Sequence, residues 1–109
     1  MEISFDPVDL ETTCRQAKRA TRLLGALAAK KLHIRLAELF NAESVAELVS
    51  GRPHPLTGDR AGQFAVDLHG GTRLVFRPTK TPPPAKTDGS VDWSKVTSVT
   101  IVFIGNYHD

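Results

Sequence analysis

The spacing of the apolar residues changes near residue 63, and this change limits the folds that the chain can adopt. Before it, leucines recur with a helical period of three to four residues, at Leu23, Leu24, Leu27, Leu32, Leu36 and Leu39. From Gln63 onward, apolar and polar residues alternate, as they do in half-buried strands. Helices followed by strands predict an α+β fold, with N-terminal helices packed on a small, mostly antiparallel sheet. The 109 residues fit a single domain, 1–109, with one modest core.

Local signals predict where the helices begin and end. Asp6–Pro7 is a helix start, with the aspartate as N-cap and the proline at the first helical position. Gly25 is either a hinge between two helices or a weak position inside one. Ser44–Glu47 fits a capping box, which predicts a short third helix that ends near Gly51.

The turn of the hairpin after Gln63 can be placed by requiring one face of the sheet to be apolar. A two-residue loop at Gly70–Gly71 would mix Leu68 with Arg73, whereas a three-residue loop, 70–72, separates apolar from polar side chains. In that register the apolar face holds Phe64, Val66, Leu68, Leu74 and Phe76. The opposite face holds Asp67, His69, Arg73 and Arg77, a set suited to a phosphate.

A proline-rich stretch separates this hairpin from the last strand. A loop of this length, at about 78–95, is uncommon inside a compact domain, and such loops tend to be functional or disordered. Asp88–Gly89 predicts a turn in it, and Trp93 is expected to pack it onto the body. Val96–Ile104 is apolar on both faces at its end and is expected to be a central strand, with Ile3–Phe5 as a short edge strand.

Basic residues are concentrated in one part of the chain, although the net charge is only +2. Seven of them, and no acid, lie between Thr12 and Ala37. Four of these residues are spaced so that they would share one face of a helix: Arg15, Lys18, Arg19 and Arg22. Such a face favours a polyanion such as ribosomal RNA, although an acidic antitoxin or plain solvent exposure would also suit it. The predicted RNA or ribosome contacts are Arg15, Lys18, Arg19, Arg22, Arg60 and Arg77.

Composition narrows the class of protein further. The single cysteine, Cys14, cannot form an internal disulfide, and no Cys/His group has the spacing of a zinc site. No apolar run is long enough to span a membrane, and the N-terminus lacks the basic region of a signal peptide. We therefore expect a cytoplasmic protein that needs neither a metal nor another cofactor and has no membrane partner.

Four residues have the chemistry for cleaving RNA without a metal. That reaction needs a base for the 2′-hydroxyl, an acid for the departing 5′-oxygen and a cation for the phosphorane charge. His54 and His108 suit either proton role, and the sequence leaves open which is acid and which is base. Arg73 offers a fork of donors to phosphate, while Tyr107 can position the nucleotide, stack on a base or transfer a proton.

Three separated motifs carry a resemblance to a known family. His-Pro-Leu-x-Gly-Asp-Arg-x-Gly at 54–62 is followed by a strand that begins at Arg73 and by a closing pair, Tyr107–His108. This combination, over roughly 15–108, resembles the HigB branch of the RelE/ParE toxins. The resemblance implies a toxin that cleaves mRNA on the ribosome and is silenced by a helix-turn-helix antitoxin of the HigA type. It also implies that His54, Arg73, Tyr107 and His108 match the functional positions of such toxins.

The chain departs from the HigB-type pattern at two positions. Thr57 stands where such toxins frequently have Lys, which removes one phosphate contact. Asn106 stands where an acid often precedes the Tyr-His pair, which removes a partner that would orient His108. The competing hypotheses are a ParE-type toxin that poisons a target such as DNA gyrase by binding, and an RNA-binding module without toxicity. Neither needs two histidines, so His54 and His108 favour the nuclease.

Overall fold

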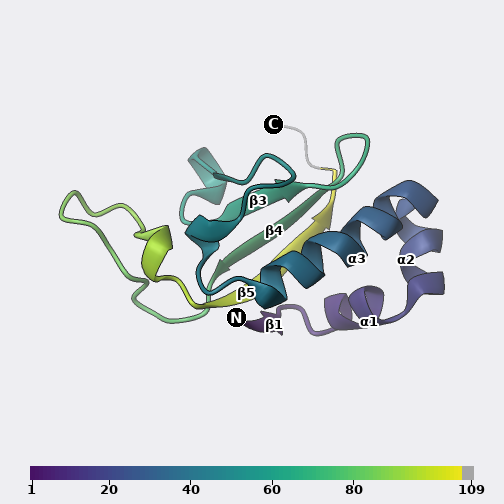
Figure 1. The fold of residues 1–109 in the computed structure, drawn as a ribbon, viewed down its shortest axis with the longest axis horizontal. Coiled ribbons are helices and arrows are strands. Elements are labelled where there is room, and N and C mark those ends of the chain that lie inside the picture. Colours follow the sequence, from purple (N-terminus) through teal and green to yellow (C-terminus); the bar gives the residue numbers. More distant parts are fainter. Residues whose placement is uncertain (107–109) are drawn as a thin grey trace.

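The computed structural model describes residues 1–106, and in this part of the chain three helices pack on a five-stranded sheet (Figure 1). The helices are α1 (Asp9–Arg15), α2 (Ala17–Leu24) and α3 (Ala26–Asn41). The strands are β1 (Glu2–Phe5), β2 (His54–Pro55), β3 (Phe64–Asp67), β4 (Arg73–Pro78) and β5 (Ser98–Gly105). Their order is β1-β5-β4-β3-β2, and only the β1–β5 pair is parallel. The predicted α+β class is confirmed, as are the edge position of β1 and the internal position of β5.

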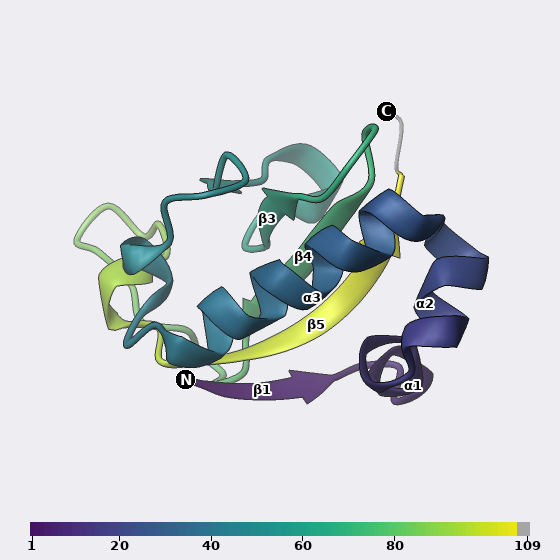
Figure 2. The same ribbon diagram turned by 45° about the vertical axis from the view of Figure 1, so that its right-hand side comes forward.

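One face of the sheet is covered by α3, which runs lengthwise across β4 and β5 in both views (Figures 1 and 2). Leu32 and Leu39 of this helix belong to the same buried cluster as the apolar side chains of the strands. The strand members of this cluster include Phe64, Val66, Leu74, Phe76, Val99 and Ile101. The later leucines of the pattern, Leu32, Leu36 and Leu39, therefore mark the packing of α3 on the sheet, whereas Leu23 and Leu27 are exposed. The candidate site lies on the opposite face of the sheet from this core.

The helix boundaries differ from the predicted ones at two places. α1 begins at Asp9 with Val8 as its N-cap, so neither Asp6 nor Pro7 starts the helix as predicted. Asp6 instead extends the contact of β1 with β5, since its amide donates to the carbonyl of Ile101 at 2.9 Å. A break that we did not predict separates α1 from α2 at Gln16, whose backbone is extended (φ −110°, ψ 105°). Gly25, with φ +86°, is the hinge between α2 and α3. Only the hinge was marked in the sequence by a residue that tolerates positive φ.

The predicted third helix is a single 3-10 turn, η1 (Val45–Glu47). Its N-cap, Ser44, makes no side-chain capping hydrogen bond. The Glu47 carboxylate instead accepts from the amide of Glu43 at 3.3 Å, one residue before the N-cap, so neither hydrogen bond of the expected capping box forms.

The β3–β4 hairpin has the predicted faces but a shifted register. Its three-residue loop is 69–71 rather than 70–72, because the Leu68 amide donates to the Thr72 carbonyl at 2.8 Å and Asp67 pairs with Arg73. The partner of each residue thus moves by two positions, and a shift of two leaves every side chain on its original face. His69 lies in the turn and leaves the polar face.

The proline-rich segment projects from one end of the sheet as an ordered loop (Figure 1). Ala85 and Val91 form an isolated antiparallel bridge around the Asp88–Gly89 turn, with a hydrogen bond from the Gly89 amide to the Lys86 carbonyl at 3.0 Å. A 3-10 turn, η3 (Trp93–Lys95), then leads to β5. The predicted packing of Trp93 is confirmed, since its ring lies 4.8 Å from that of Phe64.

Two phenylalanines provide a matched test of the core. Phe76 is fully buried under α3, whereas Phe40 is 67% exposed. We expect Phe76→Ala to lower the free energy of unfolding by about 3–5 kcal/mol, because it leaves a cavity, and Phe40→Ala to lower it by less than about 1 kcal/mol. Urea unfolding of both variants measures the difference. Equal losses would mean that the α3–sheet contact is not the main core.

Candidate functional site

A row of side chains crosses four strands on the face of the sheet that α3 does not cover. His54 pairs with Ala65, Ala65 with Val75, and Val75 with Phe103. Directly paired residues point to the same side of a sheet, and residues in the strand two positions away point there as well. Because Phe64 and Phe76 face the helix-side core, this row faces away from it. The predicted residues His54 and Arg73 therefore share one face.

Arg73 is held at this face by an acidic neighbour on the adjacent strand. Its Nε lies 2.9 Å from Oδ1 of Asp67, the residue directly opposite it in the β3–β4 pair. Oδ2 of the same carboxylate lies 2.7 Å from Nε of Arg52, whose segment precedes β2. One carboxylate thus joins two guanidinium groups. The alternation in β3 places Asp67 on this face, whereas no signal in the sequence marks Arg52, because it lies outside any periodic segment.

The carboxylate of Asp67 is ionised more readily than an ordinary aspartate. Partial burial raises its pKa, but the hydrogen bonds from Arg73 and Arg52 and their positive charges outweigh burial, so the net pKa is lowered. Asp67 therefore stays charged at neutral pH, and its charge offsets one of the two arginines.

The backbone beside His54 selects one form of its imidazole ring. Nδ1 lies 2.6 Å from the carbonyl oxygen of Arg52, and a carbonyl oxygen can only accept a hydrogen bond. Nδ1 therefore carries a proton in this contact, which leaves Nε2 as the ring nitrogen available for proton transfer to or from a substrate. The ring is half-buried, which suits a group that must reach a substrate.

The other two predicted contacts on this face lie apart from each other. The guanidinium of Arg60 lies 4.8 Å above the ring of Phe103, and its Nη1 donates to Oε1 of Gln63 at 3.1 Å. Arg77 lies toward the opposite end of β4, where it is 3.7 Å from the carboxylate of Asp6. Arg60 stacks on Phe103, which belongs to the same row as His54. Three residues of β4 lie between Arg73 and Arg77.

The four basic residues predicted to share one helical face do not form one stripe, because α1 ends at Arg15 and the chain is extended at Gln16. Arg15 pairs with Glu11 at 2.6 Å, and Nε of Arg19 donates to the hydroxyl of Thr13 at 3.3 Å. Lys18 and Arg22 remain one turn apart and exposed on α2. The predicted stripe is therefore reduced to the basic surface of α2.

Tyr107 and His108 lie outside the described residues. Gly105 pairs with Arg73 at the end of β5. Asn106 packs against the hairpin turn, since a Cβ added at Gly71 would lie 3.1 Å from its Nδ2. The end of β5 thus lies next to Arg73.

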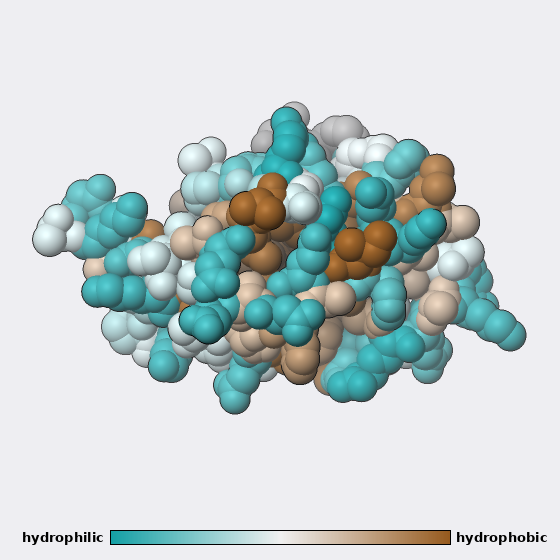
Figure 3. Space-filling model, in the orientation of Figure 1, coloured by the Kyte–Doolittle hydropathy of each residue, from teal (hydrophilic) through white to brown (hydrophobic). Residues whose placement is uncertain are grey.

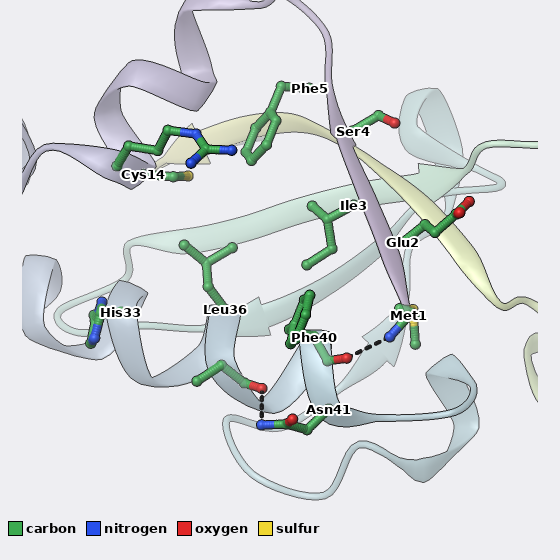
Figure 4. Close-up of a pocket in the computed structure, with 12 residues that line it drawn as sticks. Met1, Glu2, Ile3, Ser4, Phe5, Cys14, His33, Leu36, Phe40 and Asn41 are labelled. Carbon is green, nitrogen blue, oxygen red and sulfur yellow. Dashed lines mark hydrogen bonds between the residues drawn. The ribbon is translucent and has the colours of Figure 1, made fainter.

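A groove of about 690 Å³ lies away from this face, between β1, α1 and α3 (Figure 4). Side chains of Ile3, Phe5, Leu36 and Phe40 line it, and the N-terminal amine donates to the carbonyl of Phe40 at 2.5 Å at one end. On the face seen in Figure 3, hydrophobic residues are interspersed with hydrophilic ones. Arg15 is the one predicted site residue among those that line the groove.

Residues 1–106 contain no group of three or more His, Cys, Asp or Glu side chains arranged to hold a metal ion. Within the same range, no helix has the length and apolar character needed to cross a membrane. The thiol of Cys14 is largely enclosed, and its pKa is raised to about 11. Burial is the larger cause of this rise, and the negative charge of Glu11 is the smaller one.

Comparison with known proteins identifies the fold. No protein-family model and no curated protein matches the sequence. The YoeB/ParE toxin from Agrobacterium tumefaciens is similar in structure, with a TM-score of 0.62 and 13% identity, over 99% of this chain and 100% of that chain. The YoeB–YefM complex and the YoeB dimer from Staphylococcus aureus both give a TM-score of 0.58, at 14% and 16% identity, over 99% of this chain and 98% of theirs.

These similarities confirm the predicted RelE/ParE-like fold. At such low identity a shared fold does not carry over the activity or the partners, which depend on the side chains of the site. The assignment to the HigB branch stays a prediction, because the similar structures bear the names YoeB and ParE.

The acid sensitivity of the fold tests the contacts of Asp67. Because its pKa is lowered in the folded state, its contribution to stability is complete above the unfolded pKa of about 3.9 and is lost as pH falls through the folded pKa. We expect Asp67→Asn to destabilise the protein by about 1 kcal/mol at pH 7, since Arg52 is largely exposed to solvent, and by less near pH 2. Urea unfolding at several pH values measures this difference. Asp59→Asn is the control at an exposed carboxylate, and a pH-independent loss for Asp67→Asn would contradict the ion pairs.

Proposed function

We propose that this chain is the toxin of a type II toxin–antitoxin pair and that it cleaves mRNA on the ribosome without a metal. In this proposal residues 1–109 form one RelE/ParE-like domain with a proline-rich insertion at about 78–95, and the protein acts in the cytoplasm. The observation that carries the proposal is that His54 and Arg73 share the sheet face opposite α3, where Gly105, two residues before Tyr107, pairs with Arg73.

The proposed reaction is a transesterification. A base removes the proton of the 2′-hydroxyl, whose oxygen attacks phosphorus while the bond from phosphorus to the 5′-oxygen breaks. An acid protonates that oxygen, leaving a 2′,3′-cyclic phosphate and a free 5′-hydroxyl. Arg73 stabilises the charge on the phosphorane, and His54 exchanges its proton through Nε2. Tyr107 and His108 complete the proposed set of groups.

The ribosome supplies what this small site lacks. Few proton-transfer groups are present, so a flexible RNA must be held in a near-attack geometry for the reaction to be fast. Lys18 and Arg22 offer a basic surface on α2 for ribosomal RNA, since the helix contains no acidic residue. Arg60 and Arg77 are proposed as further RNA contacts on the sheet face.

The proposed regulatory partner is an antitoxin with a helix-turn-helix domain of the HigA type. The complex of YoeB with YefM supports an antitoxin partner by analogy of fold. The runner-up function is a ParE-like toxin that poisons a target such as DNA gyrase by binding. The half-buried His54, with its Nδ1 fixed by a carbonyl, favours the nuclease, because a binding poison needs no oriented proton-transfer group.

Substitution of single site residues tests the activity. We expect Arg73→Ala and His108→Ala to lower the rate of mRNA cleavage on ribosomes by on the order of 100-fold or more and to abolish growth arrest. His69→Ala, in the exposed hairpin turn, is the matched control and should retain full activity. Circular dichroism establishes that each variant is folded. Full toxicity of folded Arg73→Ala and His108→Ala would favour the gyrase-type alternative.

Charge reversal on α2 tests the route to the ribosome. Each phosphate contact contributes about 0.7 to 0.9 to the slope of log affinity against log salt, so Lys18→Glu combined with Arg22→Glu should reduce that slope by roughly 1.5. Lys86→Glu combined with Lys95→Glu, in the proline-rich loop, keeps the same net charge and should leave the slope closer to wild type. If both pairs change the slope equally, net charge alone accounts for binding.

A further inference from the structure

Asp67 makes more contacts than a simple surface ion pair. Besides its two arginine partners, its amide donates to the carbonyl of Gly51 at 2.6 Å, and its own carbonyl accepts from Nε of Arg35 at 3.4 Å. Arg35 in turn lies 2.8 Å from the carboxylate of Glu38 and is nearly buried. Asp67 is therefore tied to α3 through its backbone and to the site through its side chain.

The segment that carries Arg52 is held in a conformation that residues with side chains seldom adopt. Arg52 has φ +46°, and among residues 1–106 it is the one residue other than glycine with positive φ. Gly51 before it, with φ +80°, approaches so closely that an added Cβ would lie 2.9 Å from the Asp67 carbonyl. Such strained backbone persists where its surroundings enforce it, and it occurs preferentially at functional sites. The same strained turn places the Arg52 carbonyl on Nδ1 of His54.

We propose that Arg52 is a second phosphate ligand beside Arg73, and that Asp67 is the positioning residue that aligns both arginines. The proposal rests on the proposed function, and it assigns Arg52 and Asp67 roles that the sequence motifs do not. The ligand is one phosphodiester of the RNA backbone.

Charge and geometry support this arrangement. Asp67 contacts Arg52 through Nε, so this contact does not use the terminal nitrogens of Arg52, which form the end of the guanidinium fork. Two guanidinium groups meet one carboxylate, and this excess of positive charge favours a phosphodiester. The side chain of Arg52 is 72% exposed and that of Arg73 is 26% exposed. Arg52 is therefore the more accessible of the two to an RNA strand that approaches from solvent.

Two variants with matched controls separate the two roles. Arg52→Ala removes the proposed ligand, and Lys86→Ala removes one exposed positive charge at the distant proline-rich loop. Asp67→Asn removes the carboxylate charge at constant size, and Asp67→Glu keeps the charge on a longer side chain. Binding is measured with a short oligoribonucleotide whose 2′-hydroxyls are methylated, because it cannot be cleaved. Cleavage of mRNA on ribosomes gives kcat and KM.

We expect Arg52→Ala to bind the oligonucleotide about tenfold more weakly and to lower the salt slope by about 0.7, as for one lost phosphate contact, while Lys86→Ala binds as wild type. Asp67→Asn should lower kcat by at least about tenfold, because both arginines lose their alignment. Its KM should change by less than about threefold, since the added net positive charge offsets the lost orientation. Asp67→Glu should recover part of kcat.

Several results would overturn the proposal. Arg52→Ala that binds as tightly as Lys86→Ala would exclude Arg52 as a ligand, and a folded Asp67→Asn with wild-type kcat would exclude positioning. Wild-type protein that binds the oligonucleotide but does not cut mRNA would instead overturn the proposed function. In that case the oligonucleotide binding assay alone tests the role of Arg52. The role of Asp67 is then tested by NMR, because the Nε–H signals of both arginines should be protected from exchange in wild type and lose that protection in Asp67→Asn.

Discussion

The pairing of β3 with β4, which sets Asp67 opposite Arg73, is the constraint on which both halves of the molecule depend. On one side of these strands the alternating side chains form the core under α3. On the other side the same alternation gathers a carboxylate, an arginine and, through β2, a histidine. A slip of one residue would bury the charges and expose Phe64 and Phe76, so the core that stabilises the fold also selects the register of the site.

The sequence predicted those features that a strong local preference or a simple period determines. The faces of the hairpin were predicted even though its turn was misplaced by one residue, because a period of two is unchanged by a shift of two. Gly25 was recognised as a hinge because glycine tolerates positive φ. The break at Gln16 was missed, since the sequence there has neither glycine nor proline, and the predicted basic stripe failed with it.

The candidate site likewise combines residues that the sequence predicted with one that it did not. Alternation placed Arg73 on the polar face of the sheet, and the motif marked His54 as a functional residue without placing it; the structure brings the two to one face. Arg52 was not predicted, because its position depends on a strained turn and on a carboxylate fifteen residues away in the chain. Under the proposed function, Arg52 would supply a cation to a site in which Thr57 stands where HigB-type toxins frequently have Lys.

The ends of the mRNA fragments distinguish a nuclease from a toxin that acts by binding, whereas the fold alone does not, because one fold can host different functions. Wild-type protein would be incubated with ribosomes that carry a defined mRNA, and the ends of the fragments would be identified by mass spectrometry. We expect a 2′,3′-cyclic phosphate on the upstream fragment and a 5′-hydroxyl on the downstream fragment, in the presence or absence of EDTA. Intact mRNA, together with accumulation of gyrase–DNA cleavage complexes in a parallel assay, would rule out the nuclease.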